Sequence, residues 1–173
     1  MAGHSDNDMA LPRFDKPVKA AIVIAPYYTA ISNAQLASAR AVLESAGATH
    51  DTIEVPGSLE IPTAVGMANR MSNYDCYVAL GCVIRGRTSH YDVVVNESAR
   101  GLMMLGLQGL CIGNGIITVE NMEQAEERAD ADRLDTAGGA AAAALHLLAL
   151  ARKWGSPKAP LGFKPASDEI KLA

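Results

Sequence analysis

Strand-like apolar runs alternate along this chain with segments whose apolar residues recur at helical spacing, and this alternation limits the possible fold more than any other feature. The expected strands are 19–26, 49–57, 74–84 and 110–119. The expected helices are 29–47, 58–72, 88–107, 121–131 and 136–154. Short continuous apolar runs are typical of strands that are buried on both faces. The order therefore predicts an α/β fold in which helices cover both faces of a parallel sheet.

Composition narrows the classes of protein to which the chain can belong. Its 173 residues are 49% hydrophobic and 20% charged, as in a soluble domain with its own core. The net charge is −4 and there is no basic run, which argues against nucleic acid or an anionic membrane as a partner. No apolar run approaches the ~18 residues that span a bilayer, and residues 1–17 do not resemble a signal peptide. We therefore expect a cytoplasmic protein.

The sequence gives no indication of a disulfide, a catalytic thiol or a metal site. Cys76, Cys82 and Cys111 have no C-x-x-C spacing, and two of them lie in apolar runs, which predicts reduced core thiols. The His, Cys and carboxylate residues have no metal-ligand spacing, so no metal site is expected. At the ends of the chain, we expect a flexible leader over 1–16 and a flexible tail over 155–173 around one domain at 17–154.

The loop at 84–90 combines groups that suit an anion and a proton transfer. Ligands of parallel α/β sheets bind at the carboxyl ends of the strands, which here are the loops 26–30, 55–60, 84–90 and 118–122. Gly86, Arg87 and Thr88 lead into a helix whose N-terminal N–H groups favour an anion such as phosphate. His90 lies beside them, and histidine is a side chain suited to proton transfer at neutral pH. The alternative is that Thr88 or Ser89 caps the helix and His90 is solvated; the residues alone slightly favour this alternative.

Three other features have an ordinary structural explanation beside a functional one. In "VPGSLEIP" (55–62), Ser58 and Glu60 could bind a polyhydroxylated ligand, or they could belong to a capped helix start. Tyr27 in "PYYT" (26–29) could stack on a flat heterocycle or cover the edge of the core. Arg128 lies on a helix rich in acids, which is usually a solvated face.

Three blocks in one order resemble the lumazine synthase family. They are "VPGSLEIP" at 55–62, "ALGCVIRGRTSHYDVVVNESARGL" at 79–102 and "NGIITVENMEQAEERA" at 114–129. The likeness covers residues 18–154, and three blocks in sequence are highly specific. It implies a flavodoxin-like three-layer α/β/α sandwich with a four-stranded parallel sheet. It also implies at least a pentamer, with active sites between neighbouring subunits.

The family's reaction would then be the expected activity. In it, 5-amino-6-ribitylamino-2,4(1H,3H)-pyrimidinedione condenses with 3,4-dihydroxy-2-butanone 4-phosphate to give 6,7-dimethyl-8-ribityllumazine, phosphate and water. This is the penultimate step of riboflavin biosynthesis, and the family uses no cofactor. Riboflavin synthase would be a possible protein partner. Two alternatives stay open: a non-catalytic relative that binds a flavin-like or ribityl ligand or serves as a structural assembly, and a related flavodoxin-like riboflavin synthase.

The resemblance also implies a role for each matching residue. His90 occupies the proton-transfer position, and the phosphate is held by Gly86, Arg87 and Thr88, with Arg128 from the adjoining subunit. The remaining positions bind the pyrimidine ring and its ribityl chain: Tyr27, Ser58, Leu59, Glu60, Val83, Ile84 and Asn114. Tyr27 would stack on the ring, and the backbone at Val83 and Ile84 would line its pocket. Asn114 stands where many members carry an aromatic residue.

The chain departs from the family pattern at three places. Arg87 stands where many members have an acid, and Ala137 precedes Gly138 where many have a lysine. An arginine gained and a lysine lost would conserve charge near the phosphate. The linker "DADRLDTAGG" lacks the pattern typical of members that form 60-subunit shells, which favours a free pentamer.

Overall fold

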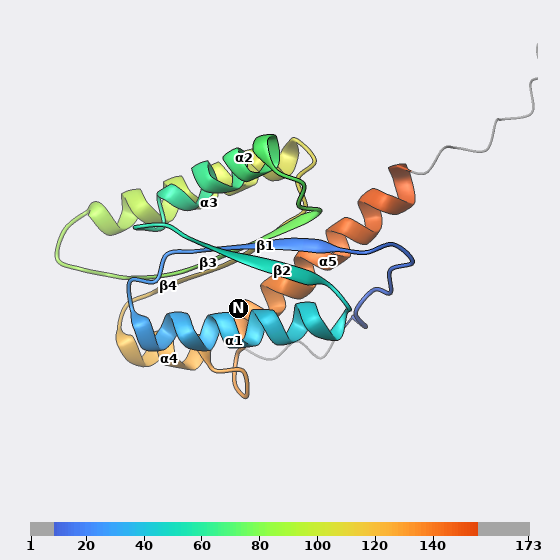
Figure 1. Cartoon of the computed structure of the whole chain (residues 1–173). Coiled ribbons are helices and arrows are strands. Elements are labelled where there is room, and N and C mark those ends of the chain that lie inside the picture. The colour runs from blue at the N-terminus through green and yellow to red at the C-terminus, as the bar shows by residue number, and fades with distance from the viewer. Residues whose placement is uncertain (1–8, 156–173) are drawn as a thin grey trace, which may run out of the picture.

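The computed structural model describes residues 9–155, in which four strands alternate with five helices (Figure 1). The strands are β1 Lys19–Ile24, β2 Thr49–Glu54, β3 Cys76–Ile84 and β4 Ile112–Val119. The helices are α1 Thr29–Ser45, α2 Glu60–Met71, α3 His90–Leu107, α4 Met122–Ala129 and α5 Thr136–Gly155. Residues 1–8 of the expected leader and 156–173 of the expected tail lie outside the described residues, so the domain boundaries stay predictions. Within 9–155 no helix is long and apolar enough to cross a membrane.

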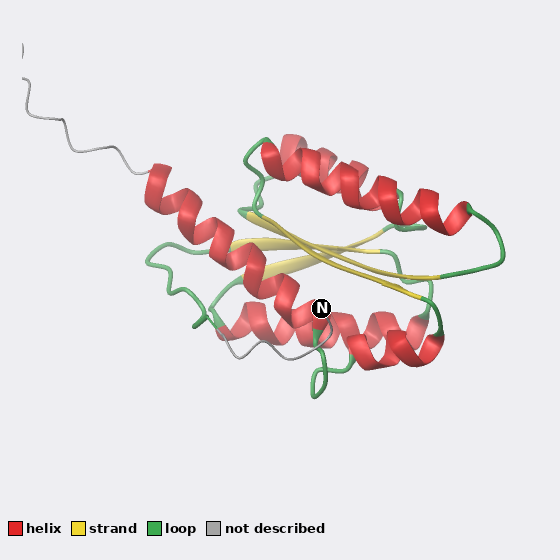
Figure 2. Ribbon diagram, turned by 180° about the vertical axis from the view of Figure 1, so that it is seen from behind, coloured by secondary structure: helices red, strands yellow, loops and turns green. Residues whose placement is uncertain are grey.

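The four strands form one parallel sheet in the order β2-β1-β3-β4. Helices α2 and α3 cover one face, and α1, α4 and α5 cover the other, as the two opposite views show (Figures 1 and 2). This arrangement confirms the predicted α/β/α sandwich with a four-stranded parallel sheet. The central strands β1 and β3 are almost entirely buried, which explains why they read as continuous apolar runs.

Helix α5 lies directly on the backbone of β4. A Cβ at Gly113 would lie 1.8 Å from the carbonyl oxygen of Ala140, so any side chain larger than hydrogen at 113 would push the helix off the strand. A Cβ at Gly115 would lie 3.0 Å from the Cβ of Ala140, so the same close approach explains why the expected strand at 110–119 contains two glycines. Glycine at these positions allows the helix to pack on the strand backbone.

The three cysteines are free and buried, as predicted. Burial raises the pKa of Cys76 to about 12 and that of Cys82 to about 11, because the apolar surroundings disfavour the thiolate. At neutral pH these thiols are protonated and act as small apolar side chains.

Two helix starts are capped by side chains. Asn121 Oδ1 accepts a hydrogen bond from the Gln124 N–H (3.0 Å), and Gln124 Oε1 accepts one from the Glu120 N–H (3.0 Å). Asp135, with φ of 40°, accepts bonds from the Gly138 N–H and from the Ser38 hydroxyl, and so joins the start of α5 to α1.

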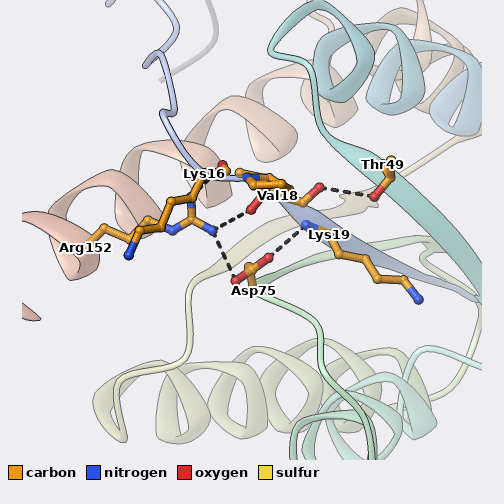
Figure 3. Close-up of polar contacts among 7 residues, drawn as sticks. Lys16, Val18, Lys19, Thr49, Asp75 and Arg152 are labelled. Atoms are coloured by element: carbon orange, nitrogen blue, oxygen red, sulfur yellow. Dashed lines mark hydrogen bonds and ion pairs between the residues drawn. The ribbon is translucent and has the colours of Figure 1, made fainter.

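The amino ends of the strands are joined to the last turn of α5 by a polar network (Figure 3). Asp75 accepts hydrogen bonds from the Lys19 N–H (2.8 Å) and from Arg152 (3.2 Å). Arg152 also donates to the carbonyl of Lys16 and lies over the ring of Phe14. A hollow of about 720 Å³ adjoins this network, at the end of the sheet opposite the predicted ligand loops. The network anchors the segment that enters β1.

Candidate active site

A pocket of about 280 Å³ lies where β1 and β3 end, as the strand-end rule predicts. Three of the four expected loops meet there. Five of the predicted site residues line it: Tyr27, Ser58, Val83, Ile84 and His90. The other lining residues are Ala25, Tyr28, Pro56, Gly57, Cys82 and Val94.

One wall of this pocket is the edge of β3 beyond the point where β1 ends. Pairing of β1 with β3 ends at Ile24 and Leu80, where the Ala25 N–H donates to the Leu80 carbonyl (3.0 Å). The Ala25 carbonyl then accepts from the Tyr27 N–H (2.9 Å), so the chain turns away from β3. Strand β3 continues to Ile84 with β4 alone beside it.

The alternation along a strand decides which backbone groups face the pocket. The N–H and C=O of Leu80 point toward β1, so those of Cys82 and Ile84 point to the same side of β3. On that side β1 has already ended, and within residues 9–155 these backbone groups have no neighbouring strand. The N–H of Arg85 bonds the Val119 carbonyl, so Val83, two residues earlier, turns its backbone toward β4. The edge can therefore pair with the donors and acceptors along the rim of a flat heterocycle, through Cys82 and Ile84.

Ser58 forms another part of the wall. It is buried, and a Cβ at Gly81 would lie 2.9 Å from its Oγ, so the loop is packed directly on β3. Helix α2 begins at Glu60, after Leu59, and has no side-chain cap, so the alternative in which Ser58 belongs to a capped helix start is not what the structure shows. The backbone turn places Ser58 one position before the N-cap, Leu59, and Ser58 lines the pocket instead. Glu60 is exposed in the first turn of α2.

The loop at 85–89 is held in place by Arg85. Its guanidinium pairs with Asp92 (3.1 Å) and Glu120 (3.0 Å) and lies 4.0 Å from the centre of the Tyr91 ring. The hydrogen bond to Glu120 and the one to Asp92 raise the pKa of Arg85. Since Arg85 is occupied by these carboxylates, Arg87 is the loop's available cation; among the described residues, no hydrogen bond or ion pair to it is found.

The N-terminus of α3 is available to a ligand. Ser89 occupies the N-cap position without a side-chain hydrogen bond to the helix, so the alternative of a side-chain cap by Thr88 or Ser89 is not what the structure shows. Gly86, Arg87 and Thr88 are exposed beside this helix end. Uncapped N–H groups, the positive end of the helix and a free arginine together favour an anion.

His90 is the first residue of α3 and lines the pocket next to this anion site. It is exposed, and none of the described residues forms a hydrogen bond or ion pair with its imidazole. An imidazole with both nitrogens available can take up and release protons for a ligand in the pocket.

Asn114 and Arg128 lie away from this pocket. Asn114 is in the middle of the edge strand β4, opposite Ala79, beside an apolar hollow of about 320 Å³ on the α3 side. Arg128 is on α4, across the sheet from α3, and donates to the Gln124 carbonyl (3.3 Å). One chain therefore does not bring these two residues to His90.

Ala137 is fully buried in the core between α5 and the sheet. A lysine there would place its ammonium among apolar side chains, so this position cannot supply a cation to the pocket of the same chain. Among residues 9–155, no cluster of three or more His, Cys, Asp and Glu could hold a metal ion.

Sequence reasoning did not identify the role of Arg85. Its partner Glu120 is 35 residues away, and only the pairing of β3 with β4 brings their ends together. The one available signal was an arginine placed directly after a buried strand. The sequence predicts Cys82 as a buried thiol, which is correct, but it does not indicate that the backbone of Cys82 faces the pocket.

Comparison with known proteins identifies the family of the chain. The model of the 6,7-dimethyl-8-ribityllumazine synthase family matches residues 17–152. The 6,7-dimethyl-8-ribityllumazine synthase of Jannaschia sp. (strain CCS1) is 76% identical over 165 residues, which cover 95% of this chain and 93% of that protein. The protein of the same name from Sphingopyxis alaskensis is 52% identical, over 78% of this chain and 95% of its own length. The chain belongs to the 6,7-dimethyl-8-ribityllumazine synthase family.

Proposed function

We propose that this chain catalyses the condensation of 5-amino-6-ribitylamino-2,4(1H,3H)-pyrimidinedione with 3,4-dihydroxy-2-butanone 4-phosphate to form 6,7-dimethyl-8-ribityllumazine. The carrying observation is the pocket in which a free strand edge, a buried serine hydroxyl and His90 meet beside an anion site. The name and 76% identity of the Jannaschia relative support this reaction, and no relative named above supports a binding-only protein.

The reaction can be followed through its proton transfers. The 5-amino group attacks the ketone and water leaves, giving an imine. Loss of phosphate then gives an enol, which tautomerises before the ribitylamino nitrogen closes the ring and water leaves again. Each step moves protons, and His90 is placed to carry them. No external oxidant or reductant is consumed, so the proposed reaction uses no cofactor.

The two ends of the pocket suit the two substrates. The pyrimidinedione ring pairs with the free edge at Cys82 and Ile84, and Ser58 binds its ribityl chain together with Leu59 and Glu60. Tyr27 is 71% exposed and its ring meets Tyr28 edge to face at 5.0 Å, which leaves a ring face available for stacking. The phosphate group binds at Gly86, Arg87 and Thr88, beside the N-terminus of α3.

A direct test is to mix the purified chain with both substrates and to record the fluorescence of the lumazine product. We expect product well above the uncatalysed background. Background fluorescence alone, with tight binding of the pyrimidinedione, would overturn the catalytic proposal in favour of the binding-only alternative.

We also propose that the chain assembles as a pentamer with active sites between subunits, to which Arg128 and Asn114 are contributed by the neighbour. Large apolar side chains exposed on α3 and α5 support an oligomer: Val93, Met103, Met104, Leu107, Leu147, Leu150 and Trp154. Light scattering should give a mass of five chains of 18.1 kDa each. A particle near a megadalton would instead show a 60-subunit shell.

Arg87 is expected to hold the phosphate. Replacing it with glutamate should raise the KM for the butanone phosphate by roughly tenfold or more, because a charge-assisted hydrogen bond is replaced by like-charge repulsion. The KM for the pyrimidinedione should change little. An unchanged KM for the phosphate substrate would remove Arg87 from the site.

Two expectations from the family resemblance complete the proposal. We place the enzyme in the cytoplasm, where its three free thiols suit a reducing compartment. We place riboflavin synthase after it as the protein that consumes its product, which co-purification would test.

A further inference from the structure

A buried amide ties α1 to two strands behind the candidate active site. Gln35 is fully buried, and its Nε2 donates to the carbonyls of Gly81 (3.1 Å) and Gly115 (3.0 Å). One side chain thus joins neighbouring points on β3 and β4, using both amide protons. Within residues 9–155 its Oε1 is buried and has no hydrogen-bond partner.

The contact of Gln35 with Gly81 lies at the point where the pairing of β3 with β1 ends. Gly81 is the first residue of β3 beyond its last pair with β1, Leu80. From Gly81 onward, β3 has a neighbouring strand on one side only, and the next three residues line the pocket. Gln35 therefore fixes the β3–β4 pair at the point where support from β1 ends.

Gly81 is also held from the other face of the sheet. A Cβ there would lie 2.9 Å from Ser58 Oγ and 3.4 Å from Ile61 Cδ1, so the serine loop rests on this glycine. A shift of the β3 backbone at Gly81 would move Ser58 and the edge at Cys82 and Ile84 together. These are the groups that the proposed function assigns to the ring and its ribityl chain.

Stability does not explain why a glutamine stands here. Both carbonyls lie within the β3–β4 pairing, so each retains a backbone partner without Gln35. The buried Oε1 without a partner is unfavourable, and an apolar side chain of similar size would remove that cost.

We propose that Gln35 is a positioning residue for recognition of the pyrimidinedione: it holds the β3 edge and Ser58 at the spacing that the ring and ribityl chain require. The proposal rests on the proposed function. It concerns the ring end of the pocket alone, because the phosphate loop is held separately by Arg85, Asp92 and Glu120.

The test is Gln35→Leu in the full chain. We expect the melting temperature to stay the same or rise, and the KM for the pyrimidinedione to rise roughly five- to tenfold. The KM for the butanone phosphate should stay within about twofold of the wild-type value. A titration of the pyrimidinedione alone should show the same weakening, which separates failure of this proposal from failure of the proposed reaction.

Ser38→Ala is the matched control, because Ser38 lies on the same helix but bonds Asp135 and touches neither carbonyl. It should lower the melting temperature and leave both KM values unchanged. Gln35→Met is the second variant and should behave like Gln35→Leu. Unchanged binding of the pyrimidinedione in a folded variant overturns the proposal, and so does the failure of both Gln35 variants to fold.

Discussion

Replacing His90 with alanine is expected to lower the kcat of lumazine formation by about 10²–10⁴-fold, with KM values changed by no more than a few-fold. The imidazole is at the mouth of the pocket, next to the anion site, where imine formation, phosphate loss and ring closure all need a proton carrier. The pocket walls are formed by other residues, so substrates should still bind. Single-turnover and steady-state kinetics on the folded variant would measure the effect.

His50→Ala is the control for this experiment. His50 is at the amino end of the sheet, where its ring pairs with Glu44 (3.1 Å), so its loss should not affect kcat. A His90→Ala variant with an unchanged kcat and weakened substrate binding would contradict the proton-transfer role and make His90 a binding residue.

Arg128→Ala should raise the KM for the butanone phosphate by roughly tenfold to a hundredfold, because the phosphate loses a charged partner. Within one chain, Arg128 is on the opposite face of the sheet from the helix that begins with His90. It can therefore serve a phosphate only in the pocket of a neighbouring subunit. That arrangement allows a stringent test, because two defective chains should repair one another.

In the test, the His90→Ala and Arg128→Ala chains are unfolded together and reassembled in equal amounts. Random mixing would leave about one quarter of the sites with both residues intact, and activity should return to about that fraction of the wild-type value. Arg133→Ala is the control, because Arg128 and Arg133 both pair with Glu127 (3.9 and 3.4 Å), but Arg133 lies in the loop after α4. Failure of the mixture to gain activity would place Arg128 outside the shared site.

The fold could be predicted from local sequence patterns, whereas the candidate site could be predicted only in part. Continuous apolar strands and periodic helices are local signals, so the layers and the parallel sheet could be predicted. The loops at Ser58 and at 85–90 could be located, because the strand-end rule depends only on the order of elements. Local patterns left open whether Ser58 caps α2 or faces a ligand, because the packing of Ser58 on Gly81 is a contact between segments that are distant in the sequence.

Long-range contacts account for what sequence reasoning missed. The role of Arg85 depends on its hydrogen bond to Glu120. The role of Gln35 depends on hydrogen bonds to two carbonyls in different strands, 46 and 80 residues away. The helix that contains Ala137 was predicted, but its burial in the core depends on packing against distant residues of α1 and the sheet. Arg128 and Asn114 lie away from the pocket of their own chain, so the roles proposed for them require a second subunit.

The separation of Arg128 from His90 within one chain also has a consequence for dosage. If each site needs residues from two chains, the number of active sites is set by the number of contacts between subunits and not by the number of folded chains. Specific activity should then fall on dilution below the dissociation constant of the assembly, while each chain stays folded. A cell that makes too little of this protein would lose the activity faster than it loses the protein.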